Sequence, residues 1–251
     1  MYSIEELDEL EQEEHTLTEE AIAIMLLRLS EVHKDLEKEL RNFYQKYGRD
    51  GVVTYQEARK WVDSKDHRKR ILVLYLIMSN RFDKVLVDLE KEFASMLDHV
   101  MDKECEYFGE DVKDKVALAW GVDKLDYSQR LKDNIELWKA QLKMDWKRSL
   151  LQRKHIDKVL EELDNRFTTI DRVLEKLTLT ESTAIGSLTR QQILKALGYS
   201  KYRFYSRPDE RRCEQCGALH GLVFPITAYE VGVTASPIHP RCRCWEVPIK
   251  D

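Results

Sequence analysis

The sequence contains little proline and little glycine, and its prolines are confined to one end. Of the 251 residues, 5 are proline and 9 are glycine, and every proline follows residue 207. Proline interrupts helix interiors and strand ladders, so residues 1–207 can form long uninterrupted helices. The scarcity of both residue types excludes a collagen-like chain and disfavours an all-β sandwich.

Long apolar runs and an excess of positive charge are also missing. No stretch reaches the roughly 18 apolar residues that cross a bilayer, and the acidic N-terminus is unlike a signal or transit peptide. The formal net charge is −5, so the chain as a whole is not a polycation suited to coating nucleic acid, although a local patch could still bind it. We therefore expect no membrane partner.

Apolar residues before position 198 recur at helical spacing. From Ile22 to Leu40 they return every three or four residues, which predicts a helix, and Thr16 with Glu19 has the spacing of a capping box that begins it. The first part of a later helix, Ile71–Met78, is apolar all round and is predicted to be buried. Further helices are predicted from a second capping box at Thr54–Glu57 to Trp61, over about 66–108, between Gly109 and Gly121, and from Asp126 or Ser128 onward.

Residues 156–177 carry an apolar seam with alternating steps of four and three over about three heptads. Its members are Ile156, Leu160, Leu163, Phe167, Ile170, Leu174 and Leu177. The simpler interpretation is a helical hairpin within the chain, and the alternative is a docking seam for another subunit. Either way, Leu163, Phe167 and Ile170 are predicted to be buried.

The helical spacing of apolar residues ends near Gly198, and short strand-like segments follow it. Short strands are predicted at Tyr202–Tyr205, Val223–Phe224 and Cys244–Ile249, in a module of about 50 residues that is too small to be held together by its core alone. We predict a mainly α protein with a long helical N-terminal portion and a small C-terminal zinc-stapled α+β module. Its three parts are a helical domain over 1–125, a long helix or helical hairpin over 126–198, and the zinc-knuckle module over 199–251.

Two closely spaced pairs of metal-ligand residues indicate the staple. Cys213 and Cys216 are separated by two residues and followed by glycine, and His239 and Cys242 repeat that spacing. Three sulfurs and one imidazole nitrogen form a closed tetrahedral set suited to structural Zn²⁺. Four of the five cysteines lie in the last 39 residues, a pattern that indicates a metal site better than a disulfide framework.

The choice of ligands stays open at this point. Cys244 could replace His239, because residues 242 and 244 point the same way on a strand. His220 is a weaker candidate and fits better as a turn histidine, and Cys105 is predicted to be a packed helix residue. The alternative to a metal is a set of free thiols or a disulfide.

Motifs for catalysis are missing around these residues. The sequence has neither half of the deaminase signature, no His-Glu-x-x-His, no Gly-x-Ser-x-Gly and no P-loop. A closed set of four ligands also leaves no metal position for a substrate. We therefore expect no catalytic residues, no small-molecule substrate and no enzymatic activity.

Three C-terminal motifs, with the pair Thr180-Glu181, resemble the phage minor head protein family, also called phage Mu F-like or head morphogenesis proteins. The motifs are Asp209–Cys216, Leu219–Pro225 and Pro237–Cys244, and the resemblance covers roughly residues 120–249. Three positions depart from the family pattern: His220 stands where Asp is usual, Ser236 where Pro is usual, and Leu179 where Arg is usual. None of them removes a proposed metal ligand.

This resemblance implies a structural protein of a tailed-phage head. Its expected partners are the portal protein, the major capsid or scaffold protein and the packaged DNA, with a location in the virion interior and in the host cytoplasm during assembly. Some family members carry a toxin enzyme after this domain, and none is expected here. The alternative function is a zinc module that binds DNA directly, through arginines gathered beside Tyr202 and Phe204. Those arginines are Arg203, Arg207, Arg211, Arg212, Arg241 and Arg243.

Overall fold

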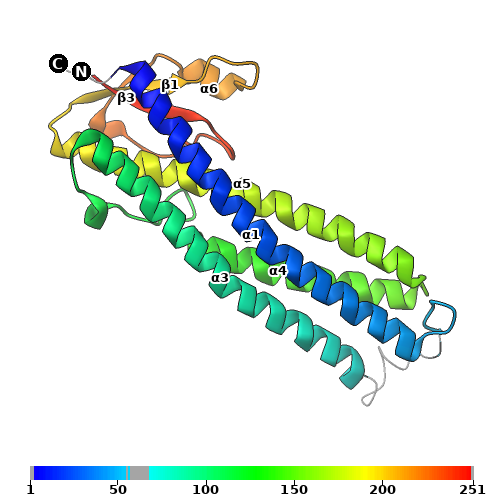
Figure 1. Cartoon of the computed structure of the whole chain (residues 1–251). Coiled ribbons are helices and arrows are strands. Elements are labelled where there is room, and N and C mark those ends of the chain that lie inside the picture. Colours follow the sequence, from blue (N-terminus) through cyan, green and yellow to red (C-terminus); the bar gives the residue numbers. More distant parts are fainter. Residues whose placement is uncertain (1–2, 55, 57–67, 250–251) are drawn as a thin grey trace. The chain divides into compact units, whose positions relative to one another are not determined.

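The computed structural model describes residues 3–54, 56 and 68–249, and it confirms a mainly helical protein with a small C-terminal strand module (Figure 1). The elements are α1 (Ile4–Tyr47), α3 (Arg68–Phe108), the 3₁₀ turn η1 (Lys113–Lys115), α4 (Tyr127–Leu151), α5 (Ile156–Ala196), β1 (Lys201–Ser206), α6 (Glu214–Leu219), β2 (Val223–Pro225), the 3₁₀ turn η2 (Ile226–Ala228) and β3 (Cys244–Ile249). Among the described helices, none combines the length and the apolar character needed to span a bilayer. The helix predicted to end at Trp61 lies outside the described residues.

Helix α1 begins twelve residues before the predicted capping box. Ser3 and Glu6 form the box instead: the Ser3 hydroxyl accepts the Glu6 amide at 3.1 Å, and the Glu6 carboxylate accepts the Ser3 amide at 2.9 Å. Thr16 lies inside the helix, where its hydroxyl donates to the Gln12 carbonyl at 2.9 Å. The prediction at Thr16 was wrong because the helical apolar spacing already starts with the buried Leu7 within the acidic segment.

The helices after α1 follow the predictions with two exceptions. The long helix is confirmed as α3, and the next one as α4, whose first turn is capped by the Asp126 carboxylate accepting the Gln129 amide at 2.9 Å. Between Gly109 and Gly121 the only described helical element is the three-residue turn η1. The predicted all-round burial near the start of α3 was also wrong, since Leu72 and Leu76 are 52% and 53% exposed.

The chain divides into two compact units, and α1, α3 and α5 each run through both. Unit 1 comprises residues 1–23, 91–129 and 174–251, and unit 2 comprises residues 24–90 and 130–173. Neither unit is one continuous stretch of sequence. The boundaries predicted near residues 125 and 198 concern independent folding and stay a prediction.

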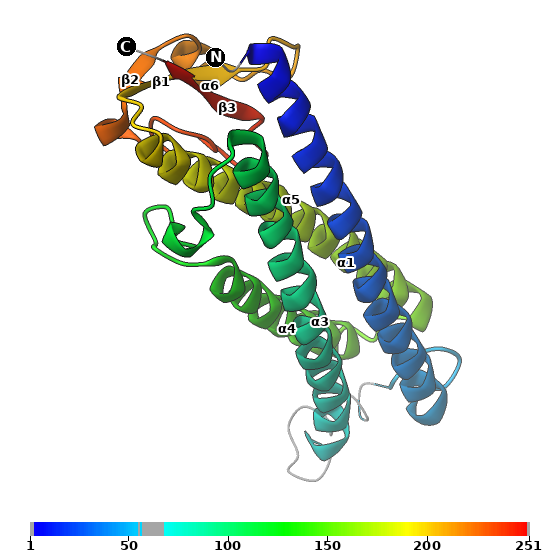
Figure 2. The same cartoon turned by 60° about the vertical axis from the view of Figure 1, so that its left-hand side comes forward.

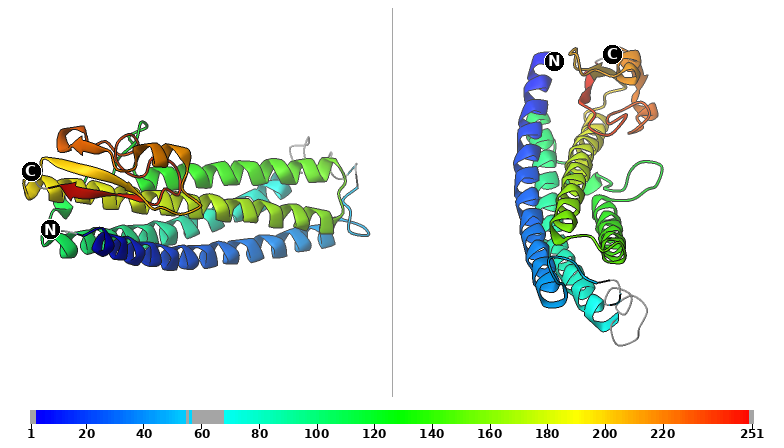
Figure 3. Two further views of the ribbon diagram at one scale, coloured as in Figure 1. Left: turned by 90° about the horizontal axis from the view of Figure 1, so that it is seen from above. Right: turned by 90° about the vertical axis from the view of Figure 1, so that its right-hand side faces the viewer.

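Unit 2 is a bundle of helical segments from α1, α3, α4 and α5, which run side by side in Figure 3. Leu163, Phe167 and Ile170 of α5 are each at most 3% exposed, as predicted. The Phe167 ring stacks on His33 of α1 at 4.5 Å and on Phe82 of α3 at 6.3 Å between ring centroids. The seam is therefore buried within the chain, which favours the intramolecular interpretation over a docking seam.

Unit 1 contains the three-stranded antiparallel sheet, in the order β2-β1-β3. All three predicted strands are confirmed, and the sheet lies beside the C-terminal part of α5 (Figure 2). Trp245 and Val247 of β3 pack with Leu7 of α1 and Ile193 of α5 in one apolar cluster. The four C-terminal cysteines belong to another cluster, around Phe204 of β1.

Candidate metal centre

The first pair of candidate ligands lies at the start of a short helix. Cys213 is the N-cap of α6, and its sulfur accepts the Cys216 amide at 3.4 Å. This capping bond folds the chain back so that both sulfurs face the same side. Cys216 is 2% exposed, whereas Cys213 is only partly buried.

The second pair comes from the segment that leads into β3. His239 places its Nε2 3.1 Å from the Cys213 sulfur and 3.3 Å from the Cys216 sulfur. Its Nδ1 lies 2.9 Å from the Pro240 carbonyl oxygen. A carbonyl only accepts, so Nδ1 carries the proton and Nε2 presents its lone pair to the sulfurs, as a metal ligand must.

Cys242 and Cys244 complete the donor set. The sulfurs of Cys216 and Cys242 are 3.7 Å apart, and Cys244 joins them in a second group of donors that all lie within 4.8 Å of one another. The first group is Cys213, Cys216 and His239, so Cys216 belongs to both. All five candidate ligands are thus brought together, and the choice between His239 and Cys244 stays open.

The spacing of two of the sulfurs matches the spacing that a tetrahedral metal ion such as zinc would set. Tetrahedral zinc with Zn–S bonds of about 2.3 Å places two sulfurs roughly 3.8 Å apart, close to the 3.7 Å between Cys216 and Cys242. The Nε2 atom of His239 lies 3.1 and 3.3 Å from the sulfurs of Cys213 and Cys216. These distances are shorter than the roughly 3.6 Å expected between a nitrogen and a sulfur that bind the same zinc ion. All five cysteines are free thiols, so the disulfide alternative is not supported.

The electrostatics of the three buried sulfurs favour a cation. Hydrogen bonds from the thiols of Cys216 and Cys244 lower the pKa of Cys242 to about 2. The same bonds raise the pKa of Cys216 and of Cys244. These opposite shifts show that the neighbouring thiols compete for negative charge, and a soft divalent cation is what allows such thiols to ionise together.

Residues outside the donor set fix the segment that carries Cys242. The Arg241 amide donates to the Thr180 hydroxyl at 3.2 Å, and the Thr183 hydroxyl donates to the Cys242 carbonyl at 3.3 Å. Both threonines are on α5, and Thr180 belongs to the Thr-Glu element noted in the sequence. The Arg243 guanidinium donates two hydrogen bonds, of 2.7 and 2.8 Å, to the Asp209 carboxylate. These bonds connect the start of β3 to the segment before Cys213.

The remaining sequence candidates have other roles. The Nδ1 of His220 accepts the Ser206 amide at 3.1 Å, and its ring packs against Tyr205. This histidine fastens the end of β1 and belongs to none of the described metal-ligand groups. Cys105 of α3 packs at the edge of the apolar cluster that contains Trp245, as predicted.

A buried polar network in unit 1 was not predicted from the sequence. Arg190 of α5, 1% exposed, donates to Glu104 of α3 and, at 2.8 Å, to Glu11 of α1. Glu246 of β3 accepts the Ser236 amide at 2.6 Å, which holds the segment before His239. Charged residues on long helices are usually solvent-exposed, so nothing in the sequence indicated that these are buried. Glu104 and Arg190 are also 86 positions apart, and no local pattern can indicate a pair at that separation.

The surface expected for direct DNA binding is only partly present. Tyr202 and Phe204 are 0% exposed, so neither can stack on a base. Three of the six arginines form ion pairs inside the protein: Arg207 with Asp8, Arg241 with Glu175, and Arg243 with Asp209.

Comparison with known proteins connects this site to one family. A sequence model described as "Phage Mu protein F like protein" matches residues 116–247, just over half of the chain and inclusive of all five candidate ligands. No curated protein and no solved structure matches the chain. The resemblance inferred from the motifs is therefore confirmed.

Proposed function

Because the chain belongs to the phage Mu protein F-like family, we propose that it is a non-enzymatic minor head protein of a tailed phage or prophage, stapled by zinc in its C-terminal module. The family suggests a role in head morphogenesis. The finer assignment, to the interior of the procapsid next to the portal, is part of the proposal. The observation that carries it is the coincidence of the family match with the five clustered donors.

Zinc has a structural task in this proposal. Cys213 and Cys216 stand at α6 while Cys242 and Cys244 stand at β3, so one ion bound between them crosslinks both ends of the module. Phe204, Leu219 and Ile238 pack against the cysteines, of which Cys216, Cys242 and Cys244 are buried. A closed set of four protein ligands supports folding rather than catalysis.

An exposed stripe on α4 is a candidate contact with other head subunits. Leu137, Met144 and Leu151 are spaced by seven residues, and they are 52%, 58% and 38% exposed. Residues seven apart lie on the same helix face. Apolar side chains aligned on one exposed face fit association with another protein.

Assembly in a heterologous host tests this function. The protein is produced together with the portal, scaffold and major capsid proteins of the same phage, and the procapsids are isolated and analysed by quantitative mass spectrometry. We expect the protein in the particles at far fewer copies than the major capsid protein. A triple change of Leu137, Met144 and Leu151 to serine should reduce incorporation while zinc content and helicity stay normal.

Two results contradict the proposal. One is a set of procapsids that form normally and never contain the protein. The other is a zinc-dependent hydrolase or transferase activity that His220→Ala abolishes, because that histidine has only a structural contact in the described structure.

A further inference from the structure

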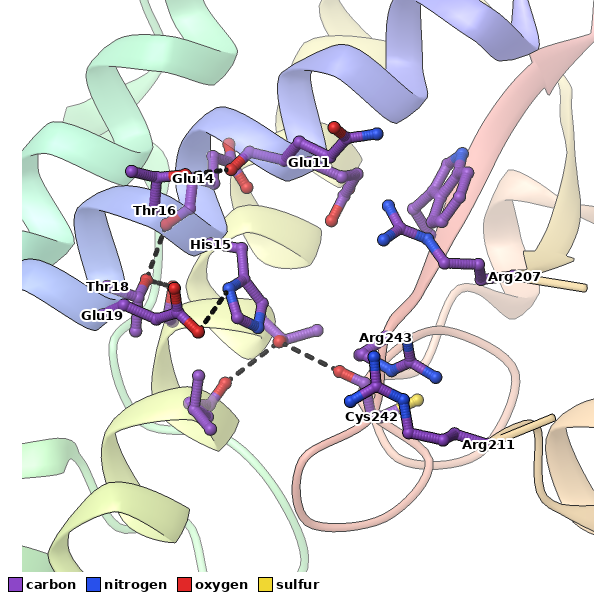
Figure 4. Close-up of a pocket in the computed structure, with 15 residues that line it drawn as sticks. Glu11, Glu14, His15, Thr16, Thr18, Glu19, Arg207, Arg211, Cys242 and Arg243 are labelled. Carbon is purple, nitrogen blue, oxygen red and sulfur yellow. Dashed lines mark hydrogen bonds and ion pairs between the residues drawn. The ribbon is translucent and has the colours of Figure 1, made fainter. Parts of the chain in front are cut away.

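The polar hollow between α1, α5 and the segments beside the cysteines favours neither an anion nor a cation (Figure 4). Glu11 and Glu19 of α1 lie on one side of it, and Arg211 and Arg243 lie on the other. A charged ligand of either sign would therefore face like charge there. The exposed face of α4 in unit 2 is more informative, because its own pattern indicates a partner.

That face carries an apolar stripe with the spacing of a coiled-coil seam. Leu137, Met144 and Leu151 are 52%, 58% and 38% exposed, and Ala140, between the first two, is exposed as well. Steps of three, four and seven residues are those of a seam that packs against a second helix. The stripe therefore fits a helical partner.

The stripe lies opposite the face that α4 buries in unit 2. Ile135, Leu142 and Ser149 are at most 1% exposed, and each precedes a member of the stripe by two residues. Two residues turn an α-helix through about 200°. One face of α4 thus packs within its own chain, and the opposite face is open to another chain.

The N-terminal end of the stripe is acidic. Asp133 and Glu136 are exposed there, and the side chain of Glu136 is 71% exposed. The buried Lys139 contacts both Glu136 and Asp83, so it does not cancel both charges. Lys132 is turned toward α3, where it contacts a carboxylate at 3.1 Å. This end therefore presents negative charge.

The C-terminal end of the stripe is basic. Lys147 and Arg148 are exposed there, and the side chain of Arg148 is 59% exposed. Arg148 contacts Asp145 at 3.8 Å, but Asp145 is already paired with Arg166 at 2.7 Å. The positive charge of this end is therefore available to a partner.

We propose that α4 pairs in the antiparallel direction with α4 of a second copy of this chain, which names the partner of the stripe and rests on the proposed function. Leu137 and Leu151 are each seven residues from Met144, so a two-fold axis near Met144 brings the stripe onto itself. The same axis places the acidic end of one copy beside the basic end of the other. A parallel pair would instead place like charges together.

Sedimentation equilibrium of the zinc-loaded full chain tests the pairing, and we expect a dimer in reversible exchange with monomer. Met144→Asp should raise the dissociation constant roughly tenfold or more, because it places an unpaired charge at the centre of the interface. Val87→Asp on α3 is the matched control, since Val87 is 49% exposed in the same unit. It should leave the dissociation constant within about twofold of the parent. An equal loss of affinity in both variants overturns the proposal.

The charged ends are tested by exchanging their signs. Lys147→Glu combined with Arg148→Glu should weaken the dimer, because both ends are then acidic. Adding Asp133→Lys and Glu136→Lys should restore it, because the ends are again of opposite charge. A reversed chain that associates no better than the double variant contradicts the antiparallel pairing.

Cross-linking tests the direction independently. In a Cys105→Ser background, a short bifunctional thiol reagent should join two Met144→Cys chains, because residue 144 lies near the two-fold axis. Leu137→Cys chains should not be joined, because antiparallel pairing places the two residues 137 about 21 Å apart along the helices. The Cys105→Ser chain alone is the control for the clustered thiols. Equally efficient cross-linking through Leu137→Cys indicates a parallel pair and overturns the proposal.

Failure of this pairing can be distinguished from failure of the proposed function. A chain that stays monomeric at every concentration overturns the pairing. If that chain still enters procapsids, the proposed function stands and the stripe contacts a different head protein. Absence of the protein from procapsids contradicts the proposed function whether or not the dimer forms.

Discussion

Cys216 is the residue on which the candidate metal centre depends most. It is 2% exposed and is the one residue shared by the two described cysteine-containing groups of metal donors. Its backbone amide also positions the first candidate ligand, because it donates a hydrogen bond to the Cys213 sulfur. Loss of its sulfur therefore breaks the site whichever of His239 and Cys244 is the fourth ligand.

Cys216→Ser should abolish zinc binding and unfold the C-terminal module. Structural zinc contributes on the order of 10 kcal/mol of folding free energy in small zinc domains. Limited proteolysis should then cut within residues 199–249 while the helices of unit 2 persist by circular dichroism. The measurement pairs the cleavage pattern with zinc analysis of the same sample.

Cys105→Ser is the matched control, because Cys105 is the cysteine outside the cluster. It should retain zinc and the parent cleavage pattern. A zinc-loaded, protease-resistant Cys216→Ser variant contradicts the assigned site. His239→Ala and Cys244→Ser, compared in the same assay, identify the fourth ligand as the one whose loss releases zinc.

Glu14 makes the stability of unit 1 depend on pH. Its folded-state pKa is raised well above 4.5, and in the unfolded chain it returns to that value. The folded protein therefore holds a proton that the unfolded protein releases. The free energy of unfolding falls as pH rises above 4.5, by up to about 1.4 kcal/mol per pH unit from this group, until the folded pKa is reached.

Glu14→Gln should flatten the fall of the melting temperature with rising pH above 4.5, and it should melt higher than the parent at the alkaline end of the profile. Glutamine keeps the shape of the protonated acid and removes the ionisation. Glu13→Gln serves as control because Glu13 is exposed and pairs with Lys103. Thermal unfolding of the three proteins at fixed zinc concentration checks this, and identical profiles for the parent and Glu14→Gln contradict it.

At the scale of elements, α5 is the scaffold of both units. Its first part supplies the apolar seam of unit 2, and its second part supplies the threonines that hold the cysteine segment and the buried Arg190 of unit 1. The seam was predictable because alternating steps of four and three are a local pattern. The second part was not, because its contacts reach residues far away in the chain.

Leu163→Asp should destabilise the protein by roughly 3 kcal/mol or more, because it places an unpaired charge in the core of unit 2. Leu163 is 2% exposed. Leu137→Asp is the control on the exposed face of α4 in the same unit and should change stability by about 0.5 kcal/mol or less. Chemical denaturation gives both values, and equal stabilities of the two variants contradict the described burial.

At the scale of the whole molecule, local features were predictable and long-range ones were not. The knuckle spacings predicted four of the clustered donors, the position of Cys244 two residues after Cys242 predicted the fifth, and the alternation around Trp245 predicted β3. The start of α1 was missed because an acidic segment looks solvated until Leu7 is seen packed against β3. The Arg190 network was missed because its residues are spread over α1, α3, α5 and β3, and no short motif joins them.

Counting zinc in the purified protein tests directly whether the clustered cysteines form a metal centre. Native mass spectrometry of the full chain, combined with elemental analysis, gives the number of ions bound per chain. We predict one tightly held zinc, with the clustered thiols of Cys213, Cys216 and Cys242 protected from a thiol reagent until the metal is chelated. Protein without metal, with all of these thiols freely titratable in the native state, would contradict it.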